Sequence, residues 1–352
     1  MEMALRWFGK LDPIPLKYIA QVPGVSGVVT SLMHIPAGEV WPLAECEAMR
    51  DEINAAGLTV KVIESVNIHE EIKLGSPERD GWIDRYVETL SNLAKIGIKI
   101  VCYNFMPVLD WARSHLFFDL PDDSNTMFFS REFMENTTPK ALAVRYAEQS
   151  GGVALPGWEP DRLKTIEETI ERYRSVSQEQ YWENTAFFLR RIIPVAEELD
   201  IRMAIHPDDP PWPIFGLPRL INSRENIQRF LDLYPSAHNG LTLCTGSLGA
   251  DRSNDIPAII REFAGKVHFA HIRNLRHLDN GDFYESAHPT PYGSLDMPAI
   301  VRALKESGFD GVIRPDHGRM IWGETGRAGY GLYDRALGAA YLTGLWEAMD
   351  TR

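Results

Sequence analysis

Cysteine is scarce in this chain. Its 352 residues include only Cys46, Cys102 and Cys244, which show no paired spacing. An odd and sparse count excludes a disulfide-framed secreted domain and is typical of reduced thiols in a cytoplasmic protein. The start, MEMALRWFGK, has no basic segment followed by an apolar run, so we expect no signal peptide. No apolar run approaches the roughly 20 residues of a membrane span. We therefore expect a cytoplasmic protein without a membrane partner.

Positive charge is also in short supply. Lys and Arg number 36 against 49 for Asp and Glu, which gives a formal net charge of −13. That balance argues against nucleic acid or an anionic membrane as the main partner. Hydrophobic residues make up 44% of the chain, enough for a sizeable core, so disorder is not expected.

Glycine-rich phosphate motifs are missing where they would be expected. The first apolar run is followed by GKLDPIP, so the dinucleotide-binding fingerprint of an open Rossmann sheet is absent. The stretch GETGRAGYG, residues 323–331, is rich in glycine but lacks the Walker spacing and its lysine. The sequence therefore favours neither class of nucleotide-binding fold.

Short apolar runs recur, usually followed by a longer amphipathic stretch. Eight runs are candidate strands: residues 4–8, 24–32, 59–65, 99–105, 201–207, 240–246, 267–273 and 311–317. Helical patterns between them include 43–57, 82–97, 223–235 and 294–308, the last two starting on the capping residues Ser223 and Ser294. Alternating strands and helices indicate a parallel sheet, and eight units predict a TIM-type (β/α)8 barrel.

One segment interrupts this alternation. From Met106 to about Pro160 the chain is aromatic, acidic and irregular, with no clean strand–helix unit. A loop of that length inside a compact domain is usually functional, and its aromatic residues argue against disorder. We therefore predict one barrel domain over residues 1–352, with 107–160 inserted after strand four as a lid or interface segment.

Four of the predicted strands end in residues that bind metals. Side chains alternate along a strand, so the apolar face of each should meet the outer helices and the other face should point into the barrel. This alternation places His206, Cys244 and Asp316 on the inner face, at the carboxyl ends of strands five, six and eight. In strand seven each face carries a histidine, His268 or His271, and we take His271 as the inward one because it lies nearer the carboxyl end. Active sites of barrels lie at that rim, and two imidazoles, a thiolate and a carboxylate form a plausible set of metal ligands.

At these residues the sequence resembles the mannonate dehydratase family. The resemblance covers essentially the whole chain, through LRWFG, VIESVNIHEEIKLG, YNFMPVLDWARS, MAIHPDDPPWPIFGLPR, LTLCTGSLG, HFAHIRN, RPDHGRMIWGE and GYGLYDRALG. It implies a TIM-type barrel and a metal-dependent hydro-lyase of hexuronate (glucuronate) breakdown. That enzyme converts D-mannonate to 2-dehydro-3-deoxy-D-gluconate and water.

The resemblance also implies roles for individual residues. The family's metal ligands match His206, Cys244, His271 and Asp316, and its metal is Mn²⁺ or Fe²⁺. Ligand types alone would favour Zn²⁺, which we expect to occupy the site in vitro. The family's proton-transfer residues match His317 and Tyr330, with Tyr333 left open as the alternative tyrosine; which of the pair is acid or base also stays open.

Substrate contacts and competing functions complete the expectations. Arg273 could hold the sugar-acid carboxylate in a two-pronged way, and Asn274 and Asn104 are further candidates for substrate binding. We expect a small-molecule sugar acid as the partner and a homo-oligomeric state. The main alternative is a metal-dependent sugar isomerase or epimerase on the same barrel, although such sites usually use several carboxylates. A zinc hydrolase and a non-catalytic sugar-acid binding protein are the others.

Overall fold

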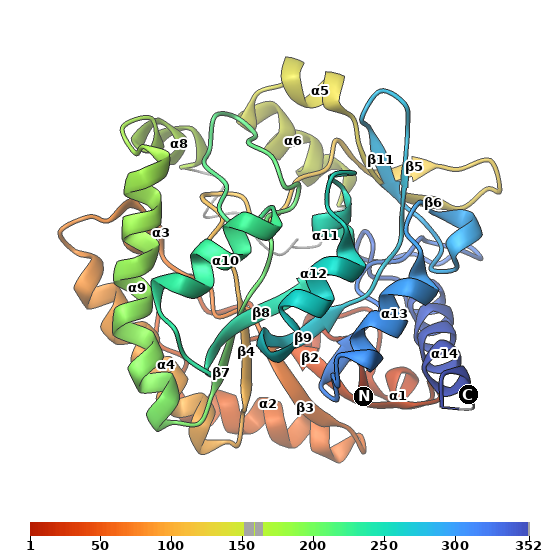
Figure 1. The fold of residues 1–352 in the computed structure, drawn as a ribbon, viewed down its shortest axis with the longest axis horizontal. Helices are drawn as coiled ribbons and strands as arrows, with labels where there is room; N and C mark the ends of the chain where they lie inside the picture. The colour runs from red at the N-terminus through yellow and green to blue at the C-terminus, as the bar shows by residue number, and fades with distance from the viewer. Residues whose placement is uncertain (151–157, 159–164, 351–352) are drawn as a thin grey trace.

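The computed structural model describes residues 1–150, 158 and 165–350 and contains a closed eight-stranded barrel (Figure 1). Neighbouring strands of the barrel are parallel and close in the order β1-β12-β9-β8-β7-β4-β3-β2. All eight predicted strands are confirmed. Their bounds are β1 (Glu2–Arg6), β2 (Val25–Thr30), β3 (Thr59–Glu64), β4 (Ile100–Tyr103), β7 (Arg202–Ile205), β8 (Asn239–Cys244), β9 (Val267–His271) and β12 (Val312–Arg314).

The inside of the barrel is a small apolar layer of its own. One buried cluster collects a residue or two from seven strands: Ala4, Val29, Val62, Ile100, Cys102, Ala204, Phe269 and Val312. The alternation predicted for strands five, seven and eight agrees with this layer, because Ala204, Phe269 and Val312 share their faces with the strand-end residues singled out above. The larger apolar cluster lies between the barrel and its helices.

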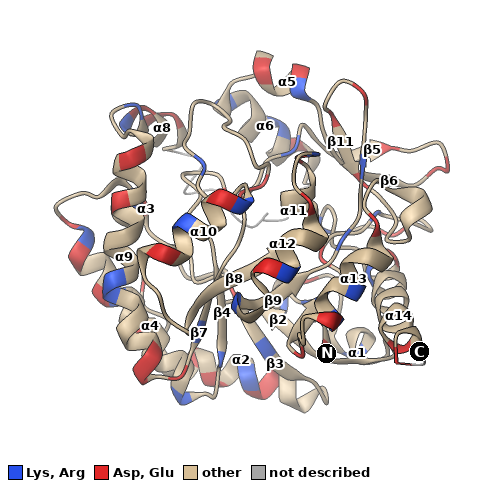
Figure 2. Cartoon of the chain, in the orientation of Figure 1, with Lys and Arg blue, Asp and Glu red and all other residues tan. Residues whose placement is uncertain are grey.

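Helices cover the outside of the barrel, and acidic and basic side chains are interspersed along them (Figure 2). Among the described residues, no helix combines the length and apolar character that crossing a membrane requires. The α-helices are α1 (Leu16–Ile19), α2 (Leu43–Ala55), α3 (Glu70–Leu74), α4 (Arg79–Lys95), α5 (Arg131–Asn136), α6 (Pro139–Gln149), α8 (Ile166–Tyr173), α9 (Gln178–Glu198), α10 (Arg224–Leu233), α11 (Thr245–Gly249), α12 (Ile256–Glu262), α13 (Met297–Glu306) and α14 (Leu332–Ala348). Short 3-10 helices span Gly9–Leu11, Ala264–Lys266 and Thr290–Tyr292.

Local capping explains where two of the predicted helices begin. Ser223 caps α10, as predicted, because its side chain accepts from the Asn226 amide. The cap predicted at Ser294 is wrong. Helix α13 begins at Met297, and Asp296 caps it by accepting from the Ala299 amide. A proline just inside this helix suits the late start, since its missing N–H is not needed there.

The segment predicted as an irregular insertion has secondary structure of its own. Its described part forms a hairpin, β5 (His115–Asp119) and β6 (Asn125–Phe129), followed by α5 and α6. The hairpin joins β11 (Phe283–Glu285) and β10 (Leu275–His277), from the connection after β9, in a four-stranded antiparallel sheet. Of the predicted 107–160 segment, residues 151–157 and 159–160 lie outside the described residues.

Candidate active site

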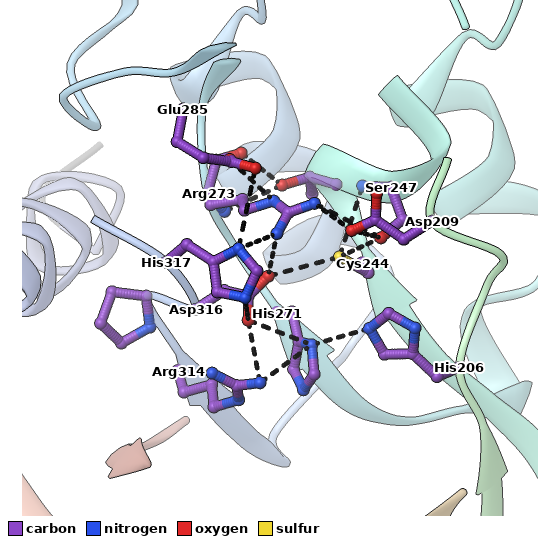
Figure 3. A network of polar contacts seen from close by, with 12 residues as sticks. His206, Asp209, Cys244, Ser247, His271, Arg273, Glu285, Arg314, Asp316 and His317 are labelled. Atoms are coloured by element: carbon purple, nitrogen blue, oxygen red, sulfur yellow. Dashed lines mark hydrogen bonds and ion pairs between the residues drawn. The ribbon is translucent and has the colours of Figure 1, made fainter. Parts of the chain in front are cut away.

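The structure brings the four predicted metal ligands together at the carboxyl ends of β7, β8, β9 and β12 (Figure 3). The ligand atoms of His206, Cys244 and His271 all lie within 4.8 Å of one another. Asp316 joins them through contacts of 3.5 Å to the Cys244 sulfur and 3.6 Å to His271 Nδ1. Strand β12 ends at Arg314, earlier than predicted. Asp316 then takes a left-handed conformation, φ +55°, as its carboxylate lies against these ligands.

Hydrogen bonds fix which nitrogen of each histidine is free to bind a cation. His206 Nδ1 lies 2.7 Å from the Pro207 carbonyl, and His271 Nε2 lies 3.2 Å from a Glu64 carboxylate oxygen. Both partners can only accept, so these nitrogens carry the ring protons. In the neutral rings the other two nitrogens, His206 Nε2 and His271 Nδ1, therefore carry the lone pairs, and they face each other at 3.1 Å. Two facing lone pairs repel each other unless a proton or a metal ion lies between them, so this arrangement fits a divalent metal.

Hydrogen-bond donors and positive charges surround the thiol and the carboxylate of the site. The Ser247 amide and hydroxyl lie 3.4 and 3.1 Å from the Cys244 sulfur, where they can stabilise a thiolate. Burial alone would raise the pKa of Asp316, but His317, Arg314 and Arg273 beside it hold that pKa well below its usual range. The site thus holds an ionised carboxylate beside a sulfur that accepts two hydrogen bonds, which suits the binding of a divalent metal.

A buried histidine–tyrosine pair lies beside the metal ligands. His317 Nε2 is 2.9 Å from the Tyr330 hydroxyl, while Tyr333 is 44% exposed and packs on Trp322. On the other side of the ring, an Arg273 nitrogen lies 2.5 Å from His317 Nδ1. A guanidinium can only donate, so neutral His317 carries its proton on Nε2, towards Tyr330. Burial, followed by Arg273, lowers the pKa of His317, and burial raises the pKa of Tyr330 to about 12.

Four buried charges form a closed ring behind this pair. Arg113 pairs with Asp209 at 2.6 Å and with Glu285 at 2.7 Å, and Arg273 pairs with the same two carboxylates at 2.8 and 3.3 Å. Burial alone would raise the pKa of Asp209, but the two arginines hold it far below its usual range. The four residues come from four segments: Arg113 from the inserted segment, Asp209 from the connection after β7, Arg273 from the connection after β9, and Glu285 from β11. The ring therefore fixes Arg273 against His317.

Of the three residues predicted to contact substrate, Asn104 and Arg273 line the cavity and Asn274 does not. Asn104 lines the cavity over the metal ligands, together with Tyr330. Arg273 also lines it, but its guanidinium is already bonded to Asp209, Glu285 and Asp316, so it is not free to hold a carboxylate. Asn274 does not line the cavity.

The polar atoms of Asn274 instead hold neighbouring segments of chain. Its amide donates to the His288 carbonyl at 3.2 Å and accepts from the Leu275 and Leu295 amides at 2.9 and 3.0 Å. The Asn274 side chain is therefore structural, contrary to the sequence expectation of a substrate contact.

Sequence reasoning did not assign a role to Glu64 and Arg314, although both line the cavity. Arg314 Nη2 lies 2.8 Å from Glu64 and 2.8 Å from Asp316, and Glu64 in turn orients His271. Such carboxylate partners of ligand histidines set ring orientation and basicity. The sequence did offer a clue to Glu64, because this carboxylate ends the third barrel strand, β3, at the same rim as the predicted metal ligands.

Comparisons with known proteins agree over the whole length of the chain. The model of the D-mannonate dehydratase (UxuA) family matches residues 1–352. A mannonate dehydratase of Thermotoga neapolitana is 54% identical over 353 residues, which are 99% of this chain and 98% of that protein. One of Lactococcus lactis subsp. cremoris is 53% identical over 356 residues, 99% of each chain.

Solved structures give the same result at two levels of similarity. The crystal structure of a D-psicose 3-epimerase superimposes with a TM-score of 0.57 and 14% identity, over 98% of this chain and 99% of the epimerase chain. That similarity supports the barrel fold alone. The crystal structure of mannonate dehydratase from Streptococcus suis serotype 2 has a TM-score of 0.89 and 42% identity, over 99% of this chain and 94% of that one. The chain therefore belongs to the D-mannonate dehydratase family.

Proposed function

We propose that this protein is a metal-dependent hydro-lyase that converts D-mannonate to 2-dehydro-3-deoxy-D-gluconate and water. Family membership supports the reaction, and one observation in the structure carries the chemistry. Two of the predicted metal ligands, His206 and Asp316, line a single cavity at the barrel rim together with the His317–Tyr330 pair, and Cys244 and His271 lie against these two ligands. That combination matches a reaction that needs both charge stabilisation and proton transfer.

His206, Cys244, His271 and Asp316 would hold the metal, with Mn²⁺ or Fe²⁺ as our proposal for its identity and Zn²⁺ as a competitor in vitro. When bound, a divalent ion would stabilise the negative charge that develops next to the substrate carboxylate when the C2 hydrogen leaves.

The two proton transfers fall to His317 and Tyr330. The C2 hydrogen must be removed, and the C3 hydroxyl leaves readily only when it is protonated. In the neutral tautomer that the Arg273 contact requires, His317 donates to the Tyr330 oxygen, which leaves the phenol proton free to point to a ligand in the cavity. Both side chains are buried, so bulk water does not compete at these atoms.

The inserted segment would cover the cavity on the side away from the barrel strands. Asp110 and Trp111, both from this segment, line the cavity beside Asn104. The Trp111 carbonyl accepts a hydrogen bond of 2.9 Å from the Trp158 indole, which ties two parts of the segment together. We propose the described part of 107–160 as a cover of the active site. The homo-oligomeric state and the cytoplasmic location stay predictions.

A product assay separates this function from the alternative isomerase or epimerase. The purified protein, loaded with Mn²⁺, is incubated with D-mannonate, and the product is identified by NMR and mass spectrometry. Dehydration gives a 2-keto-3-deoxy acid that is lighter by one water, whereas an isomerase or epimerase keeps the mass of the substrate. The assay is repeated with Fe²⁺ and with Zn²⁺. A product of unchanged mass, or no turnover with Mn²⁺, Fe²⁺ or Zn²⁺, would refute the proposal.

The role of Cys244 as a ligand gives a prediction about metal affinity. We expect Cys244→Ser to weaken metal binding by more than ~100-fold, because loss of a ligand should exceed the 10–100-fold effect of losing an outer partner. Metal content and a metal titration measure this, with circular dichroism as the fold control. Cys46→Ser is the matched variant, since Cys46 is a buried thiol on α2 outside the site, where burial raises its pKa to about 11. Full metal occupancy in Cys244→Ser would make Cys244 a core residue only.

A further inference from the structure

The metal ligands occupy only one half of the barrel rim. They come from β7, β8, β9 and β12, whereas β1, β2, β3 and β4 close the other half. A six-carbon sugar acid is long enough that, with its reacting end at the metal, its remaining hydroxyl groups lie beyond the ligands. The side chains around the opposite half are therefore where recognition of that end should be sought.

Three buried arginines gather around Tyr330, where β1 of that half pairs with β12 of the ligand half. Arg6 ends β1, Arg314 ends β12, and Arg327 belongs to the connection that carries Tyr330; their exposures are 4%, 1% and 4%. The guanidinium carbons of Arg6 and Arg327 lie 4.7 and 4.3 Å from the centre of the Phe8 ring. That ring meets the Tyr330 ring edge-on at 4.7 Å. Arg314 and Tyr330 themselves line the cavity.

These arginines keep hydrogen-bond donors without partners. Among the described residues, Nη1 of Arg6 and both Nε and Nη1 of Arg314 and Arg327 have no acceptor. Arg6 and Arg327 also form no ion pair with a described residue, and burial lowers the pKa of each. Buried donors are nearly always satisfied, so a group of five such atoms, two of them on the cavity-lining Arg314, needs an explanation.

A nearby arginine shows that burial alone does not produce this pattern. Arg335 is also buried and packs over the Tyr330 ring, with its guanidinium carbon 5.6 Å from the ring centre. Its three nitrogens donate to the carbonyls of Gly331, Arg6 and Tyr330 at 2.8–2.9 Å. Arg335 is therefore a structural residue, whereas the other three retain unused donors.

We propose that Arg6, Arg314 and Arg327 form the subsite that binds the hydroxyl-rich far end of the sugar acid, at C5 and C6. Hydroxyl oxygens are acceptors, and charged donors bind them more strongly than neutral ones do. Arg273, the cation expected to bind substrate, lies at the opposite nitrogen of the His317 ring from Tyr330 and pairs with Asp209, Glu285 and Asp316, so it does not belong to this group. The inference rests on the proposed function, because it assumes a polyhydroxy acid in this cavity.

The test compares a full-length substrate with a truncated one. L-Erythronate keeps the carboxylate and the configuration of D-mannonate at C2 and C3 but lacks C5 and C6. With Mn²⁺-loaded protein, kcat and KM are measured for D-mannonate, and the inhibition constant is measured for L-erythronate. We expect Arg327→Gln to lower kcat/KM for D-mannonate at least tenfold, mainly through KM, and to change the inhibition constant of L-erythronate less than threefold.

Further variants keep this test decisive. If Arg327→Gln does not fold, Arg327→Lys and Arg6→Lys keep the charge but not the planar donor group, and should show the same selective loss. Arg302→Gln, which removes an exposed charge from α13, should change neither constant. Equal weakening of both ligands, or of neither, would overturn the subsite. Absence of D-mannonate turnover in the unaltered protein would instead refute the proposed function.

Discussion

His317→Asn should lower turnover of D-mannonate by ~100-fold or more while leaving metal content unchanged. Asparagine can reproduce both hydrogen bonds of the ring, since its oxygen can accept from Arg273 and its amide can donate to Tyr330. It cannot transfer a proton near neutral pH, and general acid–base groups contribute on this scale. Steady-state kinetics, metal analysis and exchange of the C2 hydrogen in deuterated water measure the effect.

The control for this variant is His277→Asn. His277 is a partly buried histidine whose Nε2 bonds the Gly249 carbonyl, outside the cavity, so its loss should leave turnover close to that of the unaltered protein. If His317→Asn retains near-normal turnover, the proton carrier lies elsewhere and His317 is only a loop residue after β12.

Asp316→Ala should fail in a different way, losing metal and activity together. Its carboxylate contacts the Cys244 sulfur and pairs with Arg314 at 2.8 Å and Arg273 at 3.0 Å. Removing one member of a buried ion pair typically costs 3–5 kcal/mol, so we also expect a loss of about that size in the free energy of unfolding of the metal-free protein. Metal analysis and urea unfolding measure the two effects.

Asp310→Ala provides the comparison, because Asp310 is exposed and lies just before β12. It should keep both metal and stability. An Asp316→Ala protein with full metal content would remove Asp316 from the ligand set and reduce its role to pairing with the two arginines.

The barrel and the meeting of the metal ligands were predictable because each depends on a local pattern. The two-residue repeat along a strand decides which side chains face inward, and parallel strands bring their carboxyl ends to one rim. Ala204 and His206 on β7 and its exit, and Phe269 and His271 on β9, follow that rule. The position of Asp316 required more, since β12 ends two residues before it and a left-handed residue completes the approach.

The ring of buried charges next to these predicted ligands was less accessible to sequence reasoning. Arg113 and Glu285 are 172 residues apart, and no periodicity relates the irregular segment that holds Arg113 to the hairpin that holds Glu285. The ion pairs of Arg273 were hidden for the same reason. Its residue type was right for a carboxylate, but the carboxylates that occupy it belong to the protein.

The ring of Arg113, Asp209, Arg273 and Glu285 has a consequence for engineering this enzyme. Loops above a barrel are often treated as exchangeable modules, because the barrel closes without them. Here the replaced loop would take Arg113 with it and leave two buried carboxylates facing one arginine. Domain grafting or loop shortening in this region should therefore be designed around that arginine, and cover and barrel should be transferred between relatives as one unit.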